Sequence, residues 1–133
     1  MPRFALLILF VVALAGCASE DAAPAQRVFF ESPADGATVQ SPFEVTMGAE
    51  GIAVAPAGTM EENTGHFHIV VNGPLVPAGA VIPADSLHLH YGTGAASATL
   101  DLPAGEHVLR LQMGDGAHMA IEGLSDQITV TVE

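Results

Sequence analysis

The chain has 133 residues, half of them hydrophobic, and it carries fifteen acidic residues against three arginines and no lysine, for a formal net charge of −12 at pH 7. So acidic a chain repels phosphate backbones and anionic head groups, which argues against nucleic acid as a partner and leaves cations, basic partners and neutral ligands. The single cysteine, Cys17, excludes an internal disulfide and a metal site built from several thiolates.

The N-terminus has the pattern of a lipoprotein export signal. Arg3 precedes an apolar run over residues 4–13 that is too short to span a bilayer, and Leu-Ala-Gly-Cys follows at 14–17. This tetrapeptide resembles a bacterial lipobox, whose cysteine is lipidated and becomes the first residue of the mature protein. The alternative is an uncleaved signal anchor with a chance cysteine.

These features predict how the chain is divided and where it resides. We expect a signal peptide over 1–16, a lipidated Cys17 with a flexible tether up to residue 26, and one domain over 27–133. The lipid on Cys17 would hold the protein at a membrane. No aspartate immediately follows Cys17, a pattern that resembles sorting to the periplasmic face of the outer membrane, although the inner membrane stays open.

Short segments of alternating polarity, separated by turn-forming Gly, Pro, Asn and Asp, predict an all-β domain. No segment has the 3.6-residue period of a helix over a useful length. The expected strands cover residues 27–31, 43–49, 66–71, 86–91, 97–102, 107–113 and 127–133. About seven strands in about one hundred residues favour a single antiparallel β-sandwich, immunoglobulin-like in size.

Alternation along two of these strands separates core residues from histidines. The residues expected in the core are Phe67, Ile69, Val71, Leu87, Leu89 and Tyr91. On the opposite faces lie His66 and His68 of one strand, and His88 and His90 of the other. The long connections before and after residues 64–71 are apolar and proline-rich, and we expect them to pack on the domain.

Each His-x-His unit places two imidazoles on one side of a strand, about 6.6–7 Å apart, from where they can converge on one ion. If the two strands are neighbours, His66, His68, His88 and His90 offer up to four nitrogens, which suits zinc or copper. His118 is a candidate fifth ligand. Otherwise the histidines are solvated, hydrogen-bonded to the loops, or a proton-sensitive patch.

Other candidate groups carry less weight. Met60 and Met119 could add thioether ligands to a copper site, while His107 is in phase with core leucines and is expected to be structural. Cupins also carry His-x-His on a strand, but Asn72 stands where their acidic ligand would be needed. No nucleophile elbow, phosphate loop or His-Glu-x-x-His motif occurs, so we expect no enzymatic activity.

Several segments together resemble a family of small exported bacterial proteins, the domain of unknown function 4399. The resemblance is carried by VFFESPADGATV, SPFEVTMGAEG, VAPAGT, TGHFHIVV, IPADSLHLHYGTG and LPAGEHVLRLQMGDGAH, which begin at residues 28, 41, 54, 64, 82 and 102. It implies an exported β-sandwich, and it marks His66, His68, His88, His90 and His118 as motif positions. It implies no particular ligand.

The sequence therefore predicts a lipoprotein of the cell envelope whose histidine-bearing face binds copper or zinc without catalysis. The alternative is an adhesion or scaffold module in which the same face binds a protein or a glycan. A metal site requires that the imidazoles meet, so the pairing of the two histidine strands decides between them. No specific protein partner is predicted.

Overall fold

The computed structural model describes residues 24–133, and the expected signal peptide and Cys17 lie outside the described residues. This part of the chain is all-β, as predicted, and contains no helix. Its strands are β1 (Arg27–Ser32), β2 (Ala37–Val39), β3 (Phe43–Glu50), β4 (Ala53–Val54), β5 (Thr64–Val71), β6 (His88–His90), β7 (Ser97–Leu100), β8 (Gly105–Gly114) and β9 (Ala120–Val132). Over residues 24–133 no helix reaches the length and hydropathy needed to cross a membrane.

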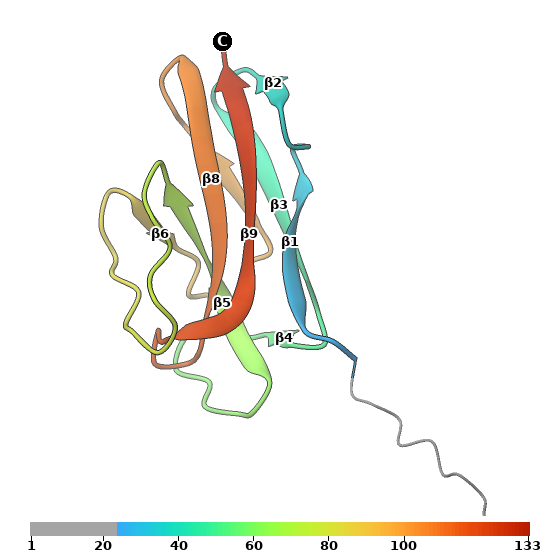
Figure 1. The fold of residues 1–133 in the computed structure, drawn as a ribbon, viewed down its shortest axis with the longest axis vertical. Coiled ribbons are helices and arrows are strands. Elements are labelled where there is room, and N and C mark those ends of the chain that lie inside the picture. The colour runs from blue at the N-terminus through green and yellow to red at the C-terminus, as the bar shows by residue number, and fades with distance from the viewer. Residues whose placement is uncertain (1–23) are drawn as a thin grey trace, which may run out of the picture.

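The strands form two sheets that pack as a sandwich (Figure 1). One sheet has three strands in the order β1-β3-β7, and the other has the order β2-β9-β8-β5-β4, with β6 also paired to β5. All pairs are antiparallel except β2 with β9 and β4 with β5. Strand β5 therefore has neighbours on both edges, β8 on one side and β4 and β6 on the other.

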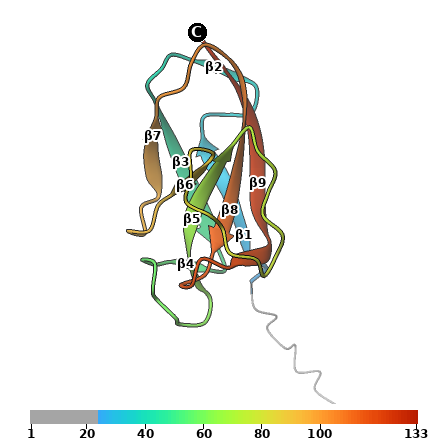
Figure 2. The same ribbon diagram turned by 90° about the vertical axis from the view of Figure 1, so that its left-hand side faces the viewer.

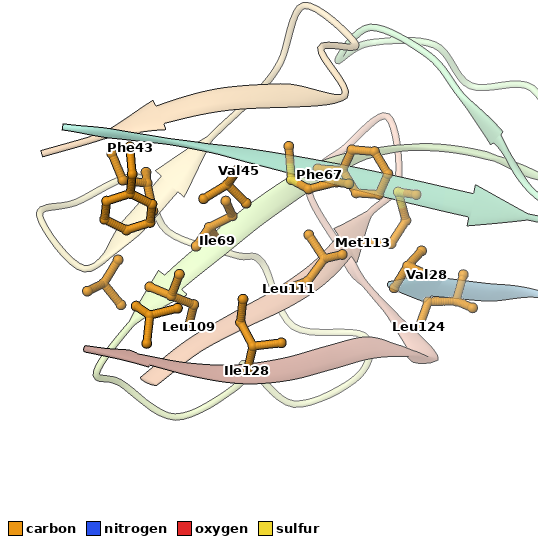
Figure 3. Packing of buried hydrophobic residues seen from close by; sticks show 14 of the residues in the cluster. Val28, Phe43, Val45, Phe67, Ile69, Leu109, Leu111, Met113, Leu124 and Ile128 are labelled. Carbon is orange, nitrogen blue, oxygen red and sulfur yellow. The ribbon is translucent and has the colours of Figure 1, made fainter. Parts of the chain in front are cut away.

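The core lies between the sheets and follows the predicted alternation. Phe67 and Ile69 of β5 lie opposite Met113 and Leu111 of β8, and all four side chains are fully buried. Figure 3 shows these residues pointing toward the other sheet, whose core residues include Val28 and Val45. Because one face of β5 is fixed in the core, the period of two sends the intervening histidines to the outer face of the sheet.

One predicted core residue is wrong. Leu87 is 46% exposed, because the second histidine strand is only three residues long and begins after it. The Leu87 amide donates instead to the Asp85 carboxylate in a turn. Leu89 and Tyr91 are partly buried against the core, as predicted.

The last two strands are longer than the sequence indicates and enclose a short connection that becomes part of the site. β9 begins at Ala120, seven residues before the predicted start, so only residues 115–119 join it to β8. Residues 120–126 show no clean alternation, and Gly123 adopts a positive φ of 73°. A glycine and a break in period both weaken a strand signal.

The connection from β5 to β6, residues 72–87, packs on the outer face of the six-stranded sheet (Figure 2). The Gln112 side chain, 4% exposed, donates from Nε2 to the Val76 carbonyl at 2.6 Å and accepts from the Val76 amide at 3.1 Å. Arg110 donates to the Gly73 carbonyl. The connection buries Ile82 and leaves Val70 with no exposed surface. The prediction that it packs on the domain is confirmed.

Candidate metal centre

Four imidazoles gather at one end of this covered face, and they come from three parts of the chain. His66 and His68 lie on β5, His90 is the last residue of β6, and His118 lies in the connection between β8 and β9. His90 is paired with His68 across the sheet, and His66 is paired with Gly114, four residues before His118. The expected pairing of the two histidine strands is therefore present.

The four rings lie at mutually similar distances. Their six centroid separations range from 4.7 to 5.9 Å. With metal–nitrogen bonds of about 2.0–2.1 Å and tetrahedral angles, the centroids of four ligating imidazoles would be about 5.2 Å apart. The centroid spacing is therefore close to that of a tetrahedral four-histidine complex.

Three of the histidines are close enough for their ligand atoms to share one ion. The nearest ring nitrogens of His66, His68 and His90 all lie within 4.8 Å of one another. Ligands of one tetrahedral ion would have nitrogens about 3.3 Å apart, so the three nitrogens would have to approach one another by up to about 1.5 Å to share an ion. A cluster of these three residues could hold a metal ion.

The buried pair lacks any other partner for its polar atoms. His66 and His68 are 0% and 1% exposed, and neither Nδ1 nor Nε2 of either ring has a hydrogen bond. A buried polar atom without a partner costs about 1–3 kcal/mol, and such atoms in native proteins call for an explanation. A metal ion would occupy one nitrogen of each ring.

Both buried imidazoles are held neutral. Burial, assisted by the neighbouring His118 and His90, lowers the pKa of His66 to about 4. Burial, followed by the effect of His66, lowers the pKa of His68 to about 3. The pKa of His90 is also lowered, by burial and by His118. A neutral imidazole has a free lone pair, which is the form that binds a metal ion.

The other two imidazoles meet at the surface. His90 is exposed and His118 is half-buried, and their Nε2 atoms are 3.1 Å apart, close enough for one ring to donate a hydrogen bond to the other. This separation is near the 3.3 Å estimated above for two ligands of one ion. The pair closes the outer side of the cluster.

His118 is held in an unusual backbone conformation by its own connection. Its φ is 64°, a left-handed value that is uncommon outside glycine. The Asp115 carboxylate accepts hydrogen bonds from the amides of Ala117 and Met119 at 2.8 and 2.9 Å, and His118 donates its amide to the Asp115 carbonyl. The covering connection adds a bond from the Ile82 amide to the His118 carbonyl. Such conformations persist where surrounding bonds impose them, often at functional sites.

Two glycines make room for the rings. A Cβ at Gly114 would lie 2.9 Å from Nε2 of His68, and a Cβ at Gly92 would fall on the His90 imidazole. Neither glycine has a positive φ, so the turn geometry does not require them. Their lack of a side chain is what lets the imidazoles pack against the backbone.

The remaining sequence-predicted residues lie elsewhere. His88, opposite Val70, donates from Nδ1 to the Asp85 carboxylate at 2.8 Å and stands outside the four-ring cluster, where His118 takes the fourth place. His107 is satisfied structurally, accepting at Nδ1 from the Asn72 side chain and donating from Nε2 to the Pro103 carbonyl. Met60 is 73% exposed.

Sequence reasoning missed the residues that support the cluster. Asp115, Gly92 and Gly114 were not singled out, because their roles depend on contacts between segments far apart in the chain. A usable signal was present for Asp115, since an Asp-Gly pair three residues before a lone histidine is typical of a tight turn.

Comparison with known proteins supports the fold but supplies no ligand. No curated protein sequence matches the chain. Among solved structures, the endo-β-1,4-mannanase from Thermotoga petrophila is similar with a TM-score of 0.52 and 18% sequence identity, over 85% of this chain and 21% of that one. The chain thus spans about a fifth of the length of the mannanase, and at this identity the likeness concerns the fold alone.

The sequence pattern of the domain of unknown function DUF4399 matches residues 45–133, a span that includes all six histidines. The chain belongs to the DUF4399 family.

Proposed function

We propose that this protein binds one zinc or copper ion through His66, His68, His90 and His118, and that it does so at the cell envelope without catalysing a reaction. The observation that carries the proposal is that the four nitrogens of the buried His66 and His68 rings lack partners. These rings lie in a cluster whose centroid spacing suits tetrahedral coordination. An ion would give one nitrogen of each buried ring a partner, whereas without it all four nitrogens stay unsatisfied.

The donor set narrows the class of ion. Four neutral nitrogens suit zinc and copper, whereas calcium and magnesium require oxygen ligands. Four protein ligands would also fill a tetrahedral shell, in contrast to catalytic zinc sites, which keep one position open for water. The ligand count therefore supports a binding role over a hydrolytic one.

The proposed location follows from the N-terminal pattern. We place the domain at a membrane through a lipid on Cys17 and a tether, in the periplasm, where exchangeable metal ions and other exported proteins would be its surroundings. Metabolic labelling with radioactive palmitate tests the anchor. Label should enter the native chain and not a Cys17→Ser variant, and equal labelling of both would contradict the anchor.

The metal site is tested on the mature chain carrying Cys17→Ser, which removes lipidation. Calorimetric titration with Zn²⁺ and Cu²⁺ should show one ion per chain, and Co²⁺ should give the intense visible bands of a tetrahedral complex. His118→Gln should weaken binding strongly, whereas His88→Gln, the matched control at a histidine outside the cluster, should leave it unchanged. A dissociation constant above about 10⁻⁴ M, or equal effects of the two substitutions, would overturn the proposal.

A further inference from the structure

We propose that an ion in this centre is exchangeable and leaves over the His90–His118 side, by transfer to an incoming neutral nitrogen-donor acceptor that replaces one of these two ligands at a time. The inference rests on the proposed function and names the partner chemistry of the same site. Three observations carry it: the exposure of the ligands, the elements that hold them, and the charge of the chain.

The inner ligands are fixed. His66 and His68 lie on a strand that is hydrogen-bonded on both edges, and their neighbour Phe67 is fully buried in the main core. Both rings are buried, and the core packing of Phe67 resists movement of the strand that carries them. These two ligands would keep hold of an ion while the outer ligands change.

The outer ligands are held by small elements at the surface. His90 ends a three-residue strand and is followed by a turn in which the Gly94 amide donates to the Tyr91 carbonyl. His118 lies in the five-residue connection between β8 and β9. Short exposed segments open with lower free energy than central strands. An approaching donor would therefore meet His90 and His118 first.

Charge selects among acceptors. The chain beyond residue 16 carries all fifteen acidic residues against Arg27 and Arg110, and Asp85 and Asp115 lie beside the histidine segments. Such a surface slows the approach of anions and favours neutral or basic partners. The acceptor is thus expected to present imidazole-type nitrogens and not a cluster of carboxylates.

The test is a kinetic measurement on the zinc-loaded mature chain with Cys17→Ser. Zinc removal by excess terpyridine, a neutral tridentate nitrogen chelator, is followed by the absorbance of its zinc complex. The observed rate should rise in proportion to terpyridine concentration, because the chelator takes part in the step that releases the ion. A rate independent of chelator concentration would mean that the ion escapes by spontaneous opening, and would overturn the inference.

Two comparisons sharpen the test. At low salt the polycarboxylate EDTA should remove zinc several-fold more slowly than terpyridine, and added salt should narrow the difference because it screens the repulsion. His90→Gln should speed removal several-fold, whereas the control His88→Gln should not. EDTA outpacing terpyridine at low salt would contradict the charge argument. Failure of the chain to bind zinc would refute the proposed function itself. The calorimetric titration described above detects that outcome before any kinetic measurement is made.

Discussion

Replacing His68 by leucine should have opposite consequences for the metal-free and metal-loaded protein. Both ring nitrogens of His68 are buried without partners, and a buried unsatisfied polar atom costs about 1–3 kcal/mol. Leucine removes both atoms and keeps an apolar side chain of similar volume, although repacking can return part of the gain. We expect the metal-free His68→Leu variant to be about 1–3 kcal/mol more stable than the native chain.

The loaded protein should behave in the reverse way. An ion present at one hundred times its dissociation constant stabilises the native chain by about 2.7 kcal/mol, and this contribution should be largely lost in the variant. For a domain of this size about 1 kcal/mol corresponds to roughly 3–6 °C in Tm. Urea denaturation and thermal melts, each with zinc and with a chelator, measure both effects.

His107→Leu is the matched control, because the same substitution there removes a histidine whose two nitrogens are both hydrogen-bonded. It should destabilise the chain by about 1–3 kcal/mol and leave the response to zinc unchanged. The reasoning fails if metal-free His68→Leu is destabilised as much as His107→Leu, or if it keeps the full stabilisation by zinc.

Three further predictions concern acid, space and charge at the same centre. The folded-state pKa values of His66 and His68 are about 4 and about 3, below the unfolded value of 6.5. The contribution of the two neutral imidazoles to stability is therefore complete above pH 6.5 and is lost as the pH falls toward 4. In that window, protonation of each of these two histidines should lower the free energy of unfolding of the metal-free chain by up to about 1.4 kcal/mol per pH unit. Urea midpoints that do not change between pH 7 and pH 5 would contradict this. Gly114→Ala places a Cβ 2.9 Å from the His68 ring and should weaken zinc binding at least several-fold in titrations, while the circular dichroism spectrum stays that of a β protein. Unchanged affinity would show that the ring has room to move. Asp115→Asn keeps an acceptor for the two amides, whereas Asp115→Ala removes the hydrogen bonds that hold the His118 connection, so the asparagine variant should bind zinc more tightly. Equal losses of affinity would indicate that the carboxylate charge matters more than its hydrogen bonds.

The parts of the fold that follow from sequence are those set by alternation. Phe67, Ile69, Leu109 and Leu111 repeat at every second position, and that period alone assigns them to one buried face. The end of β8, the early start of β9 and the exposure of Leu87 depend on turns and on partners distant in the chain. Local pattern carries little information about such contacts.

The candidate site divides along the same line. Alternation gave His66 and His68 a common face, and the two His-x-His units indicated neighbouring strands. Which of His88 and His118 joins the cluster was beyond local pattern, because it depends on a register that pairs His88 with Val70 and on a connection folded by Asp115. The supporting glycines at 92 and 114 are recognisable only when the rings they accommodate have been placed.

The alternation on β5 also separates two properties that could vary independently. The side chains of Phe67, Ile69 and Val71 pack in the core between the sheets, whereas those of His66 and His68 lie on the opposite face of the strand and take no part in that core. A library that varies positions 66, 68 and 90 among residues of similar size should therefore yield folded members with altered ion preference. The domain would serve as a scaffold in which coordination chemistry can diverge while the architecture is preserved.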